Sequence, residues 1–264
     1  MKINYNSRRQ FIKSAALSFG AFSIVPINVL GKRHIPPSDK FNIGVIGTGA
    51  QGMGLSIGFN KLSETQVVAA CDIDKVKYKR FLLEFEKSSN SGKNNNKNQL
   101  FFTDNYFDLL NRKDVDGVVV STPDHWHAAM SIDAMRLGKH VYCEKPLSHT
   151  IKEGRAMVNA SKKYDRVLQT GSMQRSSSNF LIGCQLVRNG YLGKISQALV
   201  NVGNPASVCK LPFEETPDSI DWDKWLGSAQ LRPYNKALIS TSFYPRWRWY
   251  KEFGGGILAD WGAH

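Results

Sequence analysis

The segment Phe41-Asn-Ile-Gly-Val-Ile-Gly-Thr-Gly-Ala-Gln-Gly52 is the most informative part of the sequence about the fold. A short apolar run ends in the pattern G-x-G-x-x-G, and Gln51–Asn60 can form the helix that follows. Gly47 permits a tight turn, Gly49 lets backbone approach a pyrophosphate, and Gly52 allows close packing of the helix on the strand. The free amides at the helix start attract phosphate. The pattern predicts a dinucleotide-binding βαβ unit.

An acidic residue closes the next strand candidate. Val67–Cys71 is apolar, and Asp72 follows it twenty residues after Gly52. A carboxylate there accepts hydrogen bonds from ribose hydroxyls and repels a 2′-phosphate. We therefore expect NAD rather than NADP as the cofactor, although Lys75 and Lys77 lie close by.

Strand and helix patterns alternate as far as Gly171. Such alternation predicts an α/β fold with right-handed crossovers and a parallel sheet covered on both faces. Beyond Gly171 the sequence becomes rich in Pro, Trp, Tyr and Arg, which indicates a second domain with long loops. The expected strands are Phe41–Ile46, Val67–Cys71, Val115–Ser121, His140–Cys143, Val167–Thr170 and Leu199–Val202, and the expected helices are Gln51–Asn60, Lys75–Lys87, Ala128–Leu137 and the helix capped by Thr150 that runs to Tyr164.

The first residues are typical of a targeting signal rather than of a folded element. Ser7-Arg8-Arg9-Gln10-Phe11-Ile12-Lys13 precedes an apolar stretch, Ala15–Leu30, that is too short and interrupted for a stable membrane span. We interpret residues 1–34 as a twin-arginine signal and expect a periplasmic protein that is exported already folded. An ordinary amphipathic helix is the alternative.

The distribution of charge and cysteine argues against a nucleic-acid-binding protein and against a metal-binding protein. The net charge is +13, but six of these charges lie in the first 33 residues and the rest are spread out, so we expect no nucleic-acid partner. Cys71 and Cys143 end apolar runs and are expected in the core, whereas Cys184 and Cys209 stay undecided. No C-x-x-C pair is present, and we expect no metal site.

Two polar clusters follow strands at the predicted ligand-binding edge. In Thr122-Pro123-Asp124-His125-Trp126-His127, the two histidines could be half of a metal site, but polar residues capping a helix explain them as well. In Glu144-Lys145-Pro146, a lysine at a cleft can donate to a substrate oxygen. A surface salt bridge with Glu144 is the alternative for Lys145.

The third cluster is Gly254–His264, at the end of the sequence. If the segment after Gly256 is helical, Asp260 and His264 stand on one face at i, i+4. A carboxylate that binds an imidazole fixes its tautomer and raises its basicity, as a general base requires. A helix-surface ion pair is the alternative.

Together these clusters resemble the Gfo/Idh/MocA family of glucose–fructose oxidoreductases and inositol dehydrogenases. The resemblance rests on Thr122-Pro123-x-x-x-His127, Glu144-Lys145-Pro146 and Asp260-x-Gly262-x-His264, with support from Gly171–Arg175 and Trp222–Gly227. It implies that Lys145 contacts the substrate hydroxyl, that His127 lies near the nicotinamide, and that His264, oriented by Asp260, takes the hydroxyl proton. Arg175 would contact substrate or cofactor. The cofactor contacts would come from Gly47, Gly49, Gln51, Gly52, Asp72, Thr122, Pro123, His127, Glu144 and Lys145.

The resemblance also implies a domain plan. A Rossmann domain at 38–170 precedes an α+β domain with an open, mainly antiparallel sheet at 171–264. Family members continue beyond the histidine that corresponds to His264, so we expect an incomplete second domain and a truncated chain.

Three functions remain open on the sequence. The first is an NAD(P)-dependent oxidoreductase that acts on a sugar, polyol or glycoside hydroxyl. The second is a glycoside hydrolase or lyase with a retained, recycled NAD, and the third is an inactive nucleotide-binding remnant. The expected partner is a small carbohydrate. We expect no stable membrane span in the chain beyond the signal, and homo-oligomerisation is left open.

Overall fold

The computed structural model describes residues 37–90, 100–240 and 245–264. Residues up to Lys40 form a separate unit, in which the described part is a short 3-10 helix, η1 (Pro37–Asp39), and the second unit is Phe41–His264. The predicted signal at 1–34 lies outside the described residues. So does most of the polar segment 88–99, whose first residues continue a helix.

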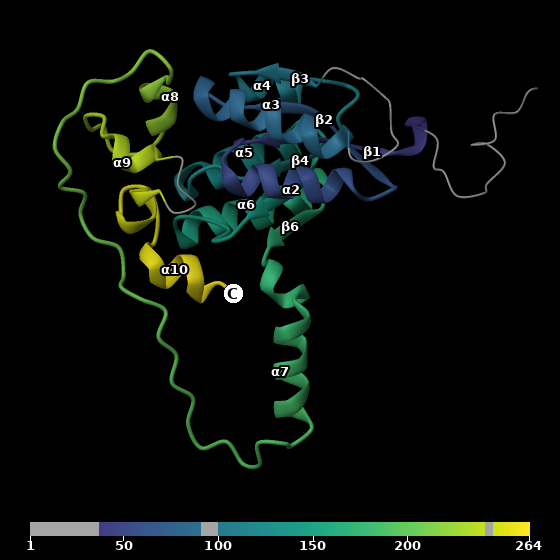
Figure 1. The fold of residues 1–264 in the computed structure, drawn as a ribbon, viewed down its shortest axis with the longest axis vertical. Coiled ribbons are helices and arrows are strands. Elements are labelled where there is room, and N and C mark those ends of the chain that lie inside the picture. Colours follow the sequence, from purple (N-terminus) through teal and green to yellow (C-terminus); the bar gives the residue numbers. More distant parts are fainter. Residues whose placement is uncertain (1–36, 91–99, 241–244) are drawn as a thin grey trace, which may run out of the picture. The chain divides into compact units, whose positions relative to one another are not determined.

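A six-stranded parallel sheet organises the second unit (Figure 1). Its order, β3-β2-β1-β4-β5-β6, reverses direction beside β1, which places a crevice at the carboxyl ends of β1 and β4. The strands are β1 (Phe41–Ile46), β2 (Thr65–Cys71), β3 (Phe101–Thr103), β4 (Gly117–Val120), β5 (His140–Glu144) and β6 (Leu168–Gly171).

Helices cover both faces of this sheet, so the α/β prediction is confirmed (Figure 1). The residues of α4, α5 and α6 pack on one face, and those of α2 and α3 on the other. These helices are α2 (Ala50–Asn60), α3 (Lys75–Asn90), α4 (Tyr106–Leu110), α5 (Asp124–Arg136) and α6 (Ile151–Tyr164). Cys71 and Cys143 lie buried in this core, as expected.

Local signals explain most of the boundaries. All four residues of β4 are buried, as expected for an apolar strand covered on both faces. Thr150 and Glu153 form the predicted capping box at the start of α6. By contrast, α5 begins at Asp124, four residues earlier than predicted, because Pro123 holds the extended backbone of an N-cap. The short β3 and α4 had not been predicted.

The part after Gly171 differs from its prediction. It contains η2 (Met173–Ser176), α7 (Ser178–Arg188), α8 (Trp222–Leu226), α9 (Lys236–Ile239), η3 (Arg246–Trp249) and α10 (Gly256–Gly262). Within the described residues this part holds no named strand, so the expected antiparallel sheet is absent there, and pairing is limited to isolated bridges such as Pro205 with Gly256 and Ser207 with Tyr250.

The predicted strand Leu199–Val202 has no regular structure, and every residue from 178 to 201 is exposed. A strand needs a neighbour to satisfy its backbone groups, and no described segment pairs with this one. An aromatic cluster instead consolidates the last part of the chain; its buried members are Ile220, Trp222, Trp225, Leu226, Tyr234, Leu238, Trp247 and Phe253. Within residues 37–90, 100–240 and 245–264, no helix has the length and apolarity needed to cross a membrane.

Candidate active site

The glycine turn has the geometry that the sequence predicts. Gly47 has φ +92°, a conformation that side chains rarely adopt, and its N–H donates to the Cys71 carbonyl at 2.9 Å. A Cβ on Gly52 would lie 1.9 Å from the Gly47 oxygen, so α2 packs directly against the turn. A Cβ on Gly49 would meet nothing within 4 Å. The backbone at Gly49 is therefore open to the crevice at the start of α2.

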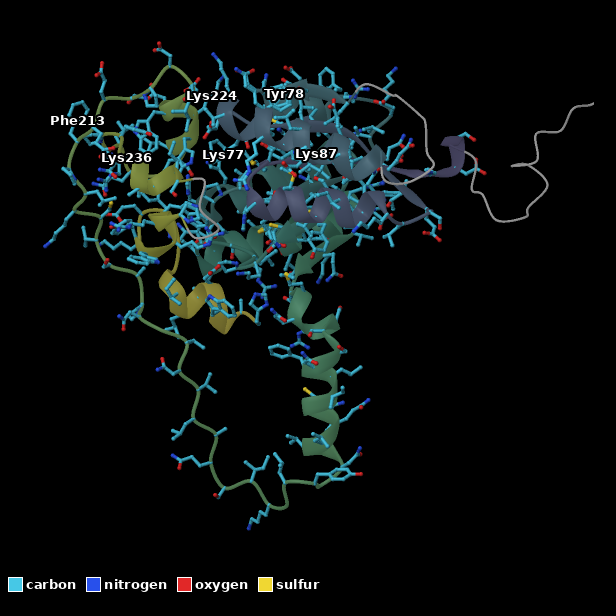
Figure 2. All side chains as sticks on the ribbon, viewed as in Figure 1. Lys77, Tyr78, Lys87, Phe213, Lys224 and Lys236 are labelled. Atoms are coloured by element: carbon cyan, nitrogen blue, oxygen red, sulfur yellow. The ribbon has the colours of Figure 1, made fainter. Side chains whose placement is uncertain are left out.

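Asp72 fixes the turn from the end of β2. Its Oδ2 accepts hydrogen bonds from the Thr48 N–H and hydroxyl, both at 2.7 Å, and its Oδ1 accepts the Asp74 N–H at 2.9 Å. The carboxylate therefore stabilises the turn in addition to lining the crevice. Lys77 from α3 and Lys224 from α8 also line the cavity (Figure 2), and each is paired with a carboxylate.

Gln51 and Glu144 join the start of α2 to the end of β5. The Gln51 amide donates to Glu144 Oε1 at 2.8 Å, and the Lys145 N–H donates to Glu144 Oε2 at 3.2 Å. Glu144 is buried, so this carboxylate does not form the surface salt bridge that was the alternative. It orients the loop that carries Lys145.

His127 holds two strand ends together. Its ring nitrogens lie 2.8 Å from the Pro146 carbonyl and 3.0 Å from the Thr122 carbonyl. Burial opposes a charged ring, but the neighbouring Cys143 and Asp124 and the Pro146 carbonyl raise the pKa of His127 to about 10. Both ring nitrogens can then donate, and His127 positions the loops from which Pro123 and Lys145 reach the crevice.

Lys145 pairs with Asp260. Its ammonium lies 2.7 Å from Asp260 Oδ1 and donates to the Asp260 main-chain carbonyl at 3.1 Å. Because α10 ends at Gly262, this carbonyl lies in the last turn of the helix, where a lysine is a favourable partner. Arg248, which the sequence analysis had not singled out, approaches the same carboxylate with Nε at 3.6 Å.

His264 lies beyond the helix, which corrects one prediction. Asp260 and His264 do not share the expected i, i+4 face of a helix, because α10 ends two residues before the imidazole. Among the described residues, His264 Nδ1 has no hydrogen-bond partner. Asp260 pairs with Lys145 rather than fixing the tautomer of His264. Burial and the nearby Lys145 charge lower the pKa of His264, which favours a neutral ring at neutral pH.

Arg175 is not part of the cavity wall. It is exposed on η2, and its neighbours Met173 and Gln174 line the cavity there. The sequence does not show which residue of this 3-10 turn faces the cavity, because successive side chains of such a turn point in different directions.

All the other predicted site residues border one cavity of about 760 Å³, except Gly52, which packs beneath the turn. The cavity extends from the glycine turn and Asp72 to Lys145, Asp260 and His264. Its volume lies within the range of cofactor and small-molecule sites. The cavity therefore brings together residues far apart in the sequence, from the turn at Gly47 to His264.

Family models match both parts of the chain. Residues 41–172 match the model of the oxidoreductase family with an NAD-binding Rossmann fold, GFO_IDH_MocA. Residues 198–264 match the C-terminal alpha/beta domain of the same family. The chain belongs to the Gfo/Idh/MocA oxidoreductase family.

Two similar proteins are named as members of one glycosyl hydrolase family. A glycosyl hydrolase family 109 protein from Solibacter usitatus is 35% identical over 72% of this chain, and another from Shewanella sp. strain ANA-3 is 30% identical over 71%. The chain spans 44% of the length of each of these two relatives.

One solved structure with a TM-score above 0.5 shows the fold of part of this chain. A 3-ketoreductase from Actinomadura kijaniata, crystallised with NADP, is 24% identical and has a TM-score of 0.51 over 59% of this chain and 44% of its own. A myo-inositol 2-dehydrogenase from Lactobacillus plantarum is 28% identical, with a TM-score of 0.49 over 59% of this chain and 43% of its own.

The cavity fits the dinucleotide that the Gfo/Idh/MocA fold implies. The Thr122 hydroxyl is buried beside the cavity and has no hydrogen-bond partner among the described residues. The first amides of α2 and the open side of Gly49 offer a phosphate site next to it. Residues Gly49–Gln51 would hold the pyrophosphate, Asp72 the adenosine ribose, and Thr122 the nicotinamide half.

Two residues that the sequence did not assign link α5 to α8. His125 Nε2 and Trp126 Nε1 lie 3.0 Å and 2.9 Å from the same Trp225 carbonyl. Asp124 is buried beside them, and burial raises its pKa to about 7. In place of half a metal site, His125 forms a contact between distant parts of the chain.

Proposed function

We propose that this site oxidises a hydroxyl of a sugar, polyol or glycoside with NAD(P) as the hydride acceptor. The observation that carries the proposal is one cavity with a glycine turn at one end and Lys145, Asp260 and His264 at the other. A bound nicotinamide would supply hydride acceptance, and the residues must supply the proton chemistry.

His264 is the proposed base. Its lowered pKa, caused by burial and by the Lys145 charge, keeps a lone pair available on the ring at neutral pH. The substrate hydroxyl would lose its proton to this ring. The reverse reaction returns the proton to the oxygen by the same path.

Lys145 is the proposed electrophilic partner. Asp260 holds its ammonium by a 2.7 Å ion pair and by the main-chain carbonyl, which leaves one of the three N–H groups for a substrate oxygen. An ammonium beside this oxygen stabilises the negative charge that develops as the proton leaves. Lys145 and His264 thus act on the same oxygen.

The test is NADH absorbance with a panel of sugars and polyols, for the wild type and for Lys145→Met and His264→Asn. We expect at least a hundredfold lower rate in both variants, which is the usual contribution of a positioned acid or base. Lys152→Met, on the exposed surface of α6, is the matched control. Rates in the two site variants that equal the control would refute the proposal.

The names of the relatives favour a second candidate. Proteins that are 30% and 35% identical are glycosyl hydrolase family 109 proteins. For such a reaction a bound NAD would supply reversible hydride acceptance at a ring carbon. The glycosidic bond would break by elimination from the oxidised sugar, water would add in its place, and the hydride would return to the sugar, so that no NADH accumulates. Cleavage of an aryl glycoside without net NADH accumulation would support this candidate, and stoichiometric NADH would support the first.

We further propose NAD rather than NADP as the cofactor. The Asp72 carboxylate is held by three donors and faces the cavity, where it would repel a 2′-phosphate. Lys77 and Lys224 also line the cavity, but Lys77 is paired with Asp74, and Lys224 with Asp104 and Asp221, so these cations do not cancel the Asp72 charge. Dissociation constants for NAD and NADP, measured by titration, test the preference; equal constants would contradict it.

Periplasmic export by the twin-arginine route is our proposal for localisation. Ser7–Lys13 carries the expected sequence, and folding before export lets the cofactor bind in the cytoplasm. Replacing Arg8 and Arg9 by lysine should retain the protein in the cytoplasm. Unchanged fractionation would contradict the proposal.

A further inference from the structure

Four tryptophans line the active-site cavity, Trp126, Trp225, Trp247 and Trp261, and Trp261 is the exposed member of this group. Trp222, Trp225 and Trp247 are between 5% and 8% exposed and pack in the aromatic cluster. Trp261 and Trp249 are 48% and 45% exposed. Trp261 lines the active-site cavity and Trp249 does not.

Trp261 occupies a fixed place beside the reacting groups. Lys145 binds the preceding residue, Asp260, through both its carboxylate and its main-chain carbonyl. This fixes the α10 backbone from which the indole projects. On the other side, the His264 ring lies 6.0 Å from the indole, centroid to centroid, at an interplanar angle of 66°. Ammonium, imidazole and indole thus border the same end of the cavity.

We propose that Trp261 is a stacking platform for the apolar face of a pyranose or cyclitol ring, and therefore selects cyclic over acyclic polyols. The inference rests on the proposed oxidation of a hydroxyl by Lys145 and His264. One face of such a ring presents several axial C–H groups. These groups can bury apolar surface on an indole and point their positive ends at its negative π face.

The geometry explains why the ring form matters. A rigid ring that rests on the platform can present one hydroxyl toward the neighbouring imidazole and ammonium without further ordering. An acyclic polyol has no flat C–H face and must lose rotational freedom to present the same hydroxyl. The platform thus contributes to affinity for rings and adds little for open chains.

The test compares three probes on the full chain with saturating NAD: methyl β-D-glucopyranoside, myo-inositol and acyclic sorbitol. Binding is measured by calorimetry for the wild type, Trp261→Ala, Trp261→Phe and the matched control Trp249→Ala. We expect Trp261→Ala to weaken both cyclic probes about tenfold, the size of one aromatic contact, and to leave sorbitol and NAD unchanged. Trp261→Phe should restore most of the affinity, and Trp249→Ala should have no effect.

Several outcomes overturn the platform: an unchanged ratio of cyclic to acyclic affinity in Trp261→Ala, equal losses in the two alanine variants, or no binding of either cyclic probe to the wild type. NADH formation is followed separately. Ring selectivity that depends on Trp261 without any NADH formation would contradict the oxidoreductase proposal alone. Turnover that depends on Lys145, with ring selectivity that ignores Trp261, would contradict the platform alone.

Discussion

The buried imidazole of His125 gives a pH-dependent stability that can be measured. The side chain is 3% exposed, with Nε2 3.0 Å from the Trp225 carbonyl and its ring against Trp225 and Phe253. Since Nε2 faces an acceptor, it carries the hydrogen, and the neutral ring already satisfies this contact. Burial lowers the pKa of His125 from its ordinary 6.5 to about 4.

The sign and size of the effect follow from linkage. As the pH falls below 6.5, the unfolded chain binds a proton at His125 while the folded chain does not, so the folded state loses relative stability. The loss is complete near pH 4, where the folded ring also protonates. A difference of about 2.5 pH units at 1.36 kcal/mol per unit corresponds to about 3 kcal/mol. This stability is fully present above pH 6.5.

The assay is urea unfolding followed by tryptophan fluorescence at pH 7.5 and pH 4, for the wild type and His125→Gln. Glutamine keeps a donor for the Trp225 carbonyl and does not titrate. We expect the wild type to lose about 3 kcal/mol more than His125→Gln between the two pH values. Equal pH dependence of the unfolding free energy in the wild type and His125→Gln would show that His125 does not cause the loss of stability.

Three further experiments test the turn, the ion pair and the cofactor preference. Gly52→Ala should abolish NAD binding, because its Cβ would lie 1.9 Å from a carbonyl oxygen, whereas Gly54→Ala, with nothing within 4 Å, should add up to about 1 kcal/mol of stability in urea unfolding. A double-mutant cycle of Asp260→Asn and Lys145→Met should give a coupling of about 3 kcal/mol in unfolding, and a value near zero would mean that the pair is screened. Asp72→Asn should reduce the preference for NAD over NADP about tenfold by titration; an unchanged ratio would assign the preference to other residues.

The Rossmann part could be predicted because its signals are local. Each apolar strand of four to seven residues is followed by a helix within a few positions, and the glycine turn and capping box fix two of the boundaries. The two short elements β3 and α4 were missed because neither is long enough to show a period. Parallel order then follows from crossover rules rather than from any single residue.

Apart from Arg175 and Gly52, the site residues that were predicted from the sequence border the cavity, but their contacts with one another could not be predicted. Lys145, Asp260 and His264 do line one cavity. Their contacts depend on where α10 ends and on a lysine 115 residues earlier, and neither is visible in sequence spacing. For the same reason Arg248 was missed: its relation to Asp260 exists only after η3 and α10 have packed against each other.

Lys145 connects the stability of the last segment to the chemistry of the site. Its ammonium binds α10 through the Asp260 carboxylate and carbonyl, and its charge lowers the pKa of His264 while the Asp260 charge raises it. The basicity of the imidazole therefore depends on the same ion pair that holds the helix in place. If Lys145 contacted the substrate alone, its substitution would leave the position of α10 unchanged. Here we infer that loss of Lys145 would alter the acid, the base and the position of the Trp261 platform together.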